Sequence, residues 1–219
     1  MSSSSEEARS VARYFHEHAE DFDSIYDESK KSTLRRVRDQ LSRGTVVQRL
    51  EFVKARAWEW KPTTALDVGC GAGRFALALA AGGTKVIGLD VAADMVKLAN
   101  EHAASAGVSD RCTFLQEDLF TWDPPERAEL TLGIGLLDYI SDADAMMARL
   151  AAATRGHLVV SFPKLVHPLV PVRAARLRLE HCPVFFYKRA DVERLARAHT
   201  PTYEIVPFHR DYLLVAEVR

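Results

Sequence analysis

Residues 64–73 read TALDVGCGAG, and this stretch decides how the rest of the chain is interpreted. Thr64–Val68 is a short, largely apolar run, and glycines follow it at positions 69, 71 and 73. Glycine is needed where a backbone turns tightly or passes close to a ligand. The pattern therefore predicts a buried strand, a glycine-rich turn and a helix that opens at Arg74, as in sheets that bind nucleotides.

Beyond this turn, short apolar runs alternate with helical stretches, which is typical of a buried parallel sheet with crossover helices. The last two runs are joined by a short loop, which indicates a closing antiparallel hairpin. The fold class is therefore α/β with seven strands. The expected strands are 64–68, 85–89, 112–116, 130–134, 158–162, 202–206 and 212–218, and the expected helices are 74–81, 92–106, 142–153 and 189–199.

The chain divides into three regions by composition. Residues 1–8 are polar and serine-rich, which predicts a disordered leader. Residues 9–61 carry apolar side chains at helical spacing and are expected to form an N-terminal helical cap. Residues 62–219 form the sheet domain, with an insertion at 163–187 that is longer than an ordinary connection.

The composition is that of an ordinary globular protein, with 47% of the 219 residues apolar and 27% charged. The net charge of −1 gives no broad attraction to nucleic acid or to an anionic membrane. The three cysteines are odd in number and far apart, which disfavours a disulfide framework or a paired zinc signature. We therefore expect a cytoplasmic protein with a small-molecule partner and without a metal, a nucleic acid or a stable membrane association.

Acidic side chains stand at the ends of three successive predicted strands. Asp67 precedes the first glycine, where it suits a cationic amine better than a phosphate. Asp90 ends the second strand, where a carboxylate can accept both hydrogen bonds of a ribose diol. Asp118 follows the third strand, where it can accept from an adenine amine while the next backbone N–H donates to the ring. Structural roles remain open for all three, as helix caps at Asp67 and Asp90 and as a turn residue at Asp118.

A dinucleotide fingerprint requires a further glycine at position 74, where this chain has arginine. This difference disfavours NAD as the ligand. An NAD-dependent oxidoreductase and a non-catalytic cofactor-binding protein remain as alternatives from other functional classes.

Four motifs follow one another along the predicted sheet: LDVGCGAGRFALALA at 66–80, VIGLDVAADMVKLA at 86–99, FLQEDL at 114–119 and LGIGLLDYI at 132–140. In sequence and spacing they resemble the class I S-adenosylmethionine-dependent methyltransferases. The resemblance implies a seven-stranded Rossmann-like sheet in the order 3-2-1-4-5-7-6, with strand 7 antiparallel and helices on both faces. It also implies S-adenosylmethionine as cofactor. The cofactor-binding residues that we expect are Asp67, Gly69, Cys70, Gly71, Gly73, Asp90, Val91, Asp118, Leu119 and Gly135.

The methyl acceptor is expected beyond the fourth strand, where Asp138 is a candidate general base and Tyr139 a candidate hydrogen-bonding wall. Packing of Tyr139 in the core and capping of a turn by Asp138 are the alternatives. In the insertion, His167 and His181 are further candidate bases. The insertion residues that can face an anionic substrate are Lys164, His167, Arg173, Arg176 and His181. Residues 9–30, with Tyr26, are expected to close over the acceptor.

Residues 14–27 and 177–187 are similar to the magnesium-protoporphyrin O-methyltransferase branch. There a tyrosine of the N-terminal segment and a histidine after strand 4 serve the reaction. Tyr26 matches the tyrosine, whereas Asp138 stands where the histidine is expected, which weakens a porphyrin assignment. The preferred function is O-methylation of a small molecule. N-methylation of an amine or guanidine and porphyrin-type carboxyl methylation are alternatives, and a homodimer is left open.

Overall fold

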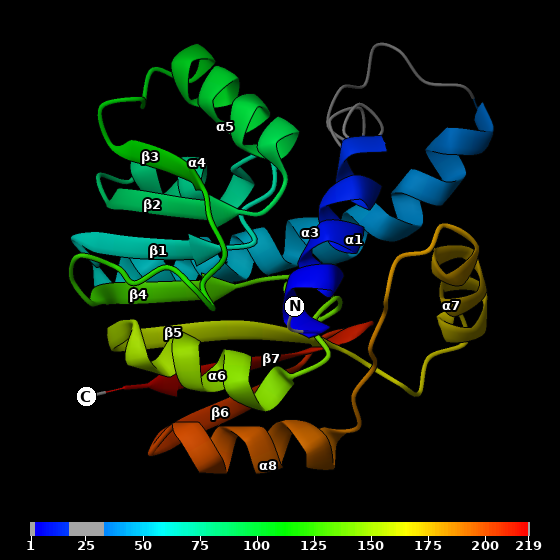
Figure 1. The fold of residues 1–219 in the computed structure, drawn as a ribbon. Helices are drawn as coiled ribbons and strands as arrows, with labels where there is room; N and C mark the ends of the chain where they lie inside the picture. Colours follow the sequence, from blue (N-terminus) through cyan, green and yellow to red (C-terminus); the bar gives the residue numbers. More distant parts are fainter. Residues whose placement is uncertain (1–2, 18–32, 219) are drawn as a thin grey trace.

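The computed structural model describes residues 3–17 and 33–218, with the side chains of residues 7–16 and 46–218. The strands in these ranges are β1 (Thr64–Val68), β2 (Lys85–Asp90), β3 (Cys112–Gln116), β4 (Ala128–Gly133), β5 (Thr154–Pro163), β6 (Thr202–Pro207) and β7 (Asp211–Glu217). They form one sheet in the order β3-β2-β1-β4-β5-β7-β6 (Figure 1). β7 is antiparallel to both of its neighbours, and the other strands pair in parallel. The predicted fold class and strand order are confirmed.

Helices cover both faces of the sheet (Figure 1). Buried side chains of α6 and α8 pack on one face with Leu158 and Val160 of β5. Buried side chains of α3, α4 and α5 pack on the other face with Leu130 and Val159. The helices are α1 (Ser3–Glu17), α3 (Thr33–Trp60), α4 (Arg74–Ala81), α5 (Ala93–Ser105), α6 (Ala143–Ala152), α7 (Val170–Leu179) and α8 (Arg189–His199).

The N-terminal helix begins earlier than the sequence indicated. α1 starts at Ser3, so the predicted disordered leader is wrong over residues 3–8. Long-range hydrogen bonds hold this helix in place, because Glu7 accepts from the Ser141 N–H at 2.9 Å and Ser10 donates to the His181 carbonyl at 2.7 Å. Tyr14 lies buried on the inner side of the helix. These partners are remote in sequence, so local composition gave no sign of them.

Strand β5 begins at Thr154 rather than at the predicted Leu158. The additional residues are polar or small, but Thr154 donates from Oγ1 to the Leu150 carbonyl at 2.6 Å and is fully buried. Gly156 permits the pairing, because a Cβ there would lie 2.4 Å from the Glu129 carbonyl oxygen. His157 then stacks on Trp60 of α3, with the ring centroids 3.9 Å apart.

The insertion at 163–187 contains α7 and closes on itself. Lys164 and Tyr187 form an isolated bridge, so the two ends of the insertion lie side by side. Leu177 is the buried anchor of α7 and packs with Tyr14 of α1. Within the ranges that the structure describes, no helix has the length and hydropathy needed to cross a bilayer.

Gly88 in the middle of β2 is expected to be sensitive to a single added methyl group. A Cβ at this position would lie 2.5 Å and 2.8 Å from two carbons of the Phe114 ring on β3. We expect Gly88→Ala to lower the free energy of unfolding by about 1–3 kcal/mol, as overpacked cores do. Urea unfolding would measure the change. The double variant Gly88→Ala/Phe114→Leu should recover part of the loss, and an unchanged midpoint in the single variant would contradict this packing.

Candidate active site

The glycine-rich turn lies at the carboxyl end of β1 and is tied to β2. The Gly69 and Cys70 N–H groups both donate to the Leu89 carbonyl, at 2.8 Å and 2.9 Å, and Gly73 N–H donates to the Cys70 carbonyl at 3.0 Å. Gly69, Gly71 and Gly73 have φ values of 70°, 52° and 83°, the left-handed region that favours glycine. The turn is therefore fixed by hydrogen bonds and needs glycine for its backbone shape.

The three glycines differ in what surrounds them. A Cβ at Gly73 would lie 3.0 Å from the Phe114 ring, and one at Gly69 would lie 3.2 Å from Leu136. At Gly71, by contrast, no described atom beyond Gly71 itself and its two chain neighbours lies within 4 Å of the Cβ position. Gly71 thus presents bare backbone to open space, and a ligand can approach the turn there.

Asp67 is buried directly beneath the turn and is 1% exposed. Its carboxylate accepts from the Ala76 N–H in the first turn of α4 at 3.2 Å. Burial raises the pKa of Asp67 to about 7; the Ala76 hydrogen bond opposes this shift and the Asp90 charge adds to it. The capping role that the sequence left open is therefore present, together with a carboxyl group that titrates near neutral pH.

The pKa of Asp67 predicts how stability depends on pH. The folded-state pKa lies above the value of about 4 for an unfolded aspartate, so between pH 4 and 7 the unfolded state loses its proton first and is favoured. Asp67→Asn should therefore match the wild type at pH 4 and exceed its free energy of unfolding by a few kcal/mol at pH 8. Urea unfolding at both pH values tests this. The exposed Asp110→Asn variant is the control, and equal pH slopes for wild type and Asp67→Asn would contradict the assignment.

Asp90 ends β2 and joins the turn to the next helix. Its Oδ2 accepts from the Gly71 N–H at 2.8 Å, and its Oδ1 accepts from the Ala92 N–H at 2.9 Å, just before α5. Burial raises its pKa, against the effect of these hydrogen bonds. Each carboxylate oxygen can accept a second hydrogen bond. Asp90 therefore fixes the turn and retains capacity for a ligand's hydroxyl groups.

Residues after β3 and β2 complete this edge of the sheet. Asp118 is half-buried and accepts from the Phe120 N–H at 2.9 Å, so it has the turn role that the sequence left open. Leu119 beside it is buried in the core. The Val91 carbonyl accepts from Gln116 Nε2 at 3.3 Å, which links the ends of β2 and β3. The ends of β1, β2 and β3 are thus brought together, as predicted from the parallel sheet.

Cys70 lies inside the turn with its side chain in the core. It is 7% exposed, and burial raises the pKa of its thiol well above the usual value. A thiol that resists ionisation is a poor nucleophile. Cys70 therefore packs the turn.

After β4, the chain runs from the turn toward α7. The Gly135 N–H donates to Ser161 Oγ at 2.7 Å, and Gly135 has a φ of 77°. Asp138 follows with its side chain 6% exposed, and its Oδ2 lies 2.5 Å from an Nη atom of Arg173 on α7. Asp138 is thus a buried carboxylate in an ion pair, and among the described residues its side chain accepts no hydrogen bond from a turn N–H.

The aromatic candidates have different surroundings. Tyr139 packs against Phe15, with ring centroids 5.4 Å apart and nearly perpendicular planes, in a small cluster with buried Tyr14 and Cys182. This supports the core reading of the Tyr139 ring. Burial raises the pKa of its hydroxyl above the usual value, although the Arg173 charge opposes this. Tyr26 and residues 18–30 of the expected cover lie outside the described residues.

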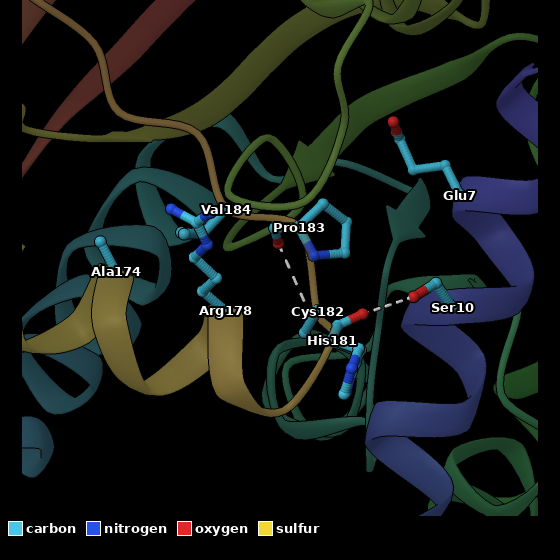
Figure 2. Close-up of a pocket in the computed structure, with 8 residues that line it drawn as sticks. All are labelled: Glu7, Ser10, Ala174, Arg178, His181, Cys182, Pro183 and Val184. Atoms are coloured by element: carbon cyan, nitrogen blue, oxygen red, sulfur yellow. Dashed lines mark hydrogen bonds between the residues drawn. The ribbon is translucent and has the colours of Figure 1, made fainter.

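His181 lies at a cavity of about 610 Å³ between α1 and α7. Figure 2 shows Glu7 and Ser10 on one side of this cavity and Arg178 on the other. The His181 side chain is exposed and its backbone adopts a φ of 53°, which is uncommon for a residue other than glycine. The Ser10 hydrogen bond to its carbonyl holds this geometry. No contact in the described structure joins His181 to Asp138.

Two charged residues that sequence reasoning missed lie near Asp138. Arg49 of α3 forms an ion pair with Asp211 at the start of β7, and its Nε donates to Asp211 Oδ2 at 3.0 Å. The Asp211 side chain is buried and the Arg49 side chain is largely buried, at 2% and 12% exposure. Two sequence signals could have pointed to these residues: Arg49 interrupts the apolar stripe of a predicted helix, and Asp211 lies in the predicted hairpin loop. Neither shows its partner until the sheet is assembled.

The region that contains the glycine-rich turn and Asp138 matches a known protein family. A family model described as a methyltransferase domain matches residues 65–156. The match covers less than half of the chain. It confirms the methyltransferase resemblance found in the sequence motifs. The matched region contains Asp67, Asp90, Asp118 and Asp138, whereas Arg49, Arg173 and Asp211 lie outside it.

Curated relatives share sequence over the same region. A ubiquinone biosynthesis O-methyltransferase from Bradyrhizobium sp. (strain ORS 278) is 34% identical over 100 residues, which are 44% of this chain and 38% of the relative. Thiocyanate methyltransferase 1 from Arabidopsis thaliana is 36% identical over 76 residues, 35% of this chain and 31% of the relative. The alignments thus span well under half the length of these relatives.

Solved structures share the fold over a longer stretch. A magnesium protoporphyrin IX methyltransferase from Synechocystis PCC 6803, with bound SAH, superposes with a TM-score of 0.77 and 20% identity, covering 97% of this chain and 100% of that one. An O-methyltransferase family 2 protein from Planctomyces limnophilus has a TM-score of 0.60 and 20% identity, covering 71% and 50%. At these identities the likeness establishes the fold.

Proposed function

We propose that this protein is an S-adenosylmethionine-dependent methyltransferase that methylates an oxygen atom of a small molecule. The observation that carries the proposal is the open backbone at Gly71, bracketed by the carboxylates of Asp67 and Asp90 within the matched region. The names of the curated relatives, which are mainly O-methyltransferases, support oxygen as the acceptor atom. The free cysteines suit a reducing cytoplasm, where we place the enzyme.

The residues at the sheet edge fit this cofactor by their chemistry. Asp67 would face the amino acid portion, because a buried carboxylate near its pKa favours a cation. Asp90 would hold the ribose hydroxyls with its remaining lone pairs, and Asp118 with the Leu119 backbone would bind the adenine edge. The open turn at Gly71 and the backbone at Val91 and Gly135 would complete the contacts. We therefore propose that the predicted cofactor residues together bind S-adenosylmethionine.

When bound, S-adenosylmethionine supplies a methyl group on a positively charged sulfur. The contribution of the chain would be to hold the acceptor in line, to exclude water and to accept a proton if the acceptor has one to lose. Asp138 is the proposed base, because its carboxylate lies after β4 and its Oδ1 has no hydrogen-bond partner in the described part of the chain. Tyr139 would act by supporting Arg173. His181 would contact an acceptor that extends into the cavity of Figure 2, which His181 lines. Tyr26 remains a candidate from the sequence.

A second candidate is transfer to a magnesium-protoporphyrin-type acceptor. It is favoured by the likeness to the Synechocystis structure, which extends over 97% of this chain and includes the insertion. It is disfavoured by Asp138, which occupies the position where that branch is expected to have histidine. Magnesium protoporphyrin IX should therefore be included among the acceptors tested.

Calorimetric titration with S-adenosylmethionine, S-adenosylhomocysteine and NADH tests the proposal. We expect saturable binding of the first two and none of NADH, followed by transfer of a labelled methyl group to a small molecule in extracts. Binding of NADH alone would indicate an oxidoreductase. Binding of S-adenosylmethionine without transfer to any acceptor would indicate a cofactor-binding protein.

A further inference from the structure

A second ion pair accompanies Asp138 and Arg173, and the two pairs form one cluster of four charges. Arg49 and Asp211 pair with each other, and both act on Asp138 through space. Burial raises the pKa of Asp138, the charges of Arg173 and then Arg49 oppose this shift, and Asp211 adds to it. The four residues come from α3, the segment after β4, α7 and the start of β7. The tertiary fold alone brings them together.

The cluster borders the segment that leads away from the glycine-rich turn. The nearest atom to a Cβ placed on Gly135 would be an Nη atom of Arg49, at 3.9 Å. The next residue, Leu136, would contact a Cβ on Gly69, at 3.2 Å. The charged cluster and the turn therefore lie on opposite ends of one short stretch of backbone, which places the cluster on the acceptor side of the proposed cofactor site.

Asp138 has an unused hydrogen-bond acceptor. Its Oδ1 is fully buried and has no hydrogen-bond partner among the described residues, whereas its Oδ2 is held by Arg173. A buried carboxylate oxygen without a donor is unfavourable, so such an atom usually signals a missing partner. A hydroxyl group of a bound molecule would supply that donor.

Arg173 is the most exposed of the four charged residues. Its side chain is 32% exposed, in contrast to the nearly buried Asp138, and its guanidinium lies 5.7 Å from the centre of the Phe186 ring. The pair uses one Nη atom and one carboxylate oxygen rather than the two parallel bonds of a fork. The observed geometry leaves donors of Arg173 for an anionic oxygen.

We propose that the methyl acceptor is a molecule with a hydroxyl group beside a carboxylate, bound between Asp138 and Arg173. Arg173 binds the carboxylate, and the hydroxyl donates to Asp138 Oδ1. As the hydroxyl oxygen bonds to the methyl carbon, the carbon–sulfur bond of the cofactor breaks to leave a neutral thioether, and Asp138 takes the hydroxyl proton. Arg49 is a positioning residue: it is fixed by its ion pair with Asp211, and its charge opposes the rise that burial causes in the pKa of Asp138, without touching the acceptor. The inference rests on the proposed methyltransferase function.

A panel of small molecules tests the substrate class, with S-adenosylhomocysteine at saturation. Salicylate and mandelate carry the two groups side by side, whereas 4-hydroxybenzoate separates them and benzoate and phenol lack one. We expect salicylate or mandelate to bind at least about tenfold more tightly than the other three by calorimetry. Arg173→Gln should abolish this preference, Arg173→Lys should retain part of it, and Arg189→Gln on α8 should leave it unchanged. Equal affinity across the panel, including no binding of any member, would overturn the proposal, as would a preference that survives Arg173→Gln.

The role of Arg49 is tested by the pH dependence of methyl transfer to the preferred panel member. The titratable groups that act on Asp138 are Arg173, Arg49 and Asp211, and the hydroxyls of Tyr139 and Tyr187 also couple to it. Loss of the Arg49 charge should raise the pKa of Asp138, so the acid limb of the rate profile should move upward by about half a pH unit or more. Because Arg49→Gln leaves Asp211 buried and unpaired, Arg49→Gln/Asp211→Asn serves as the folded comparison. It removes both charges, so its acid limb should return toward that of the wild type. An unshifted limb in the folded Arg49→Gln variant would overturn the positioning role.

S-adenosylhomocysteine binding distinguishes failure of the proposed substrate class from failure of the proposed function. If the wild type binds it and the panel shows no preference, the proposed function stands and the substrate class is wrong. If the wild type does not bind it, the proposed function itself fails.

Discussion

Replacing Gly71 with valine is expected to weaken S-adenosylhomocysteine binding by more than about 100-fold, while the protein remains folded. Gly71 has a φ of 52°, which a branched side chain resists, and its Cβ would project into the space above the turn. Beyond Gly71 and its two chain neighbours, the described residues contribute no atom to that space within 4 Å, so the added side chain would meet the ligand rather than the core. Calorimetry measures the affinity, and circular dichroism confirms the fold.

Gly107 provides a matched control for this substitution. It has a φ of 67°, and no described atom beyond Gly107 and its two chain neighbours lies within 4 Å of its Cβ position, but it follows α5 at the far end of that helix from Asp90. Gly107→Val should impose comparable backbone strain and change the affinity by less than about threefold. Equal losses in the two variants would show that strain alone explains the result. Retained binding in folded Gly71→Val would place the ligand elsewhere.

Asp90→Ala is expected to weaken binding of the same ligand by about 10- to 100-fold. Hydrogen bonds to a charged group contribute about 1.5–3 kcal/mol, and this range converts to that loss of affinity. The carboxylate also holds the Gly71 and Ala92 N–H groups, so part of the effect will come from a looser turn. Asp90→Asn keeps one oxygen acceptor and should lose less.

Asp142 tests whether the effect belongs to the ligand or to helix capping. Asp142 is the N-cap of α6 and accepts from the Ala145 N–H at 2.9 Å, away from the turn. Asp142→Ala should lower the free energy of unfolding by about 1 kcal/mol and leave the affinity unchanged. If Asp90→Ala also lowers stability but not affinity, Asp90 is a capping residue and the ribose assignment is wrong.

The sheet was predictable because its signals are local. β1 and β3 have the predicted bounds, since each is an apolar run bordered by clear turn residues. The start of β5 was missed because Thr154 and Gly156 are stabilised by partners on other elements, which no local pattern displays. α7 was left as an irregular insertion because, within it, Leu177 is buried while Val172 and Leu179 are exposed, so helical periodicity of apolar residues is absent.

The carboxylates of the candidate site were predictable from the sequence, whereas its ion pairs were not. Asp67 and Asp90 follow strands whose carboxyl ends must meet in a parallel sheet, so their proximity followed from the fold class. The ion pair of Asp138 with Arg173 and the pair of Arg49 with Asp211 join residues 35 and 162 positions apart. Such pairs depend on how α3 and α7 pack against the sheet, and no local sequence pattern indicates that packing. The direction of Tyr139 also depends on α1, through its contact with Phe15.

A structure of this protein in complex with S-adenosylhomocysteine would show whether the glycine-rich turn is the cofactor site. We expect the ligand to lie over Gly71 at the carboxyl ends of β1, β2 and β3, with both ribose hydroxyls donating to the Asp90 carboxylate at hydrogen-bonding distance. A ligand bound elsewhere, or one in the turn whose ribose makes no contact with Asp90, would contradict this assignment.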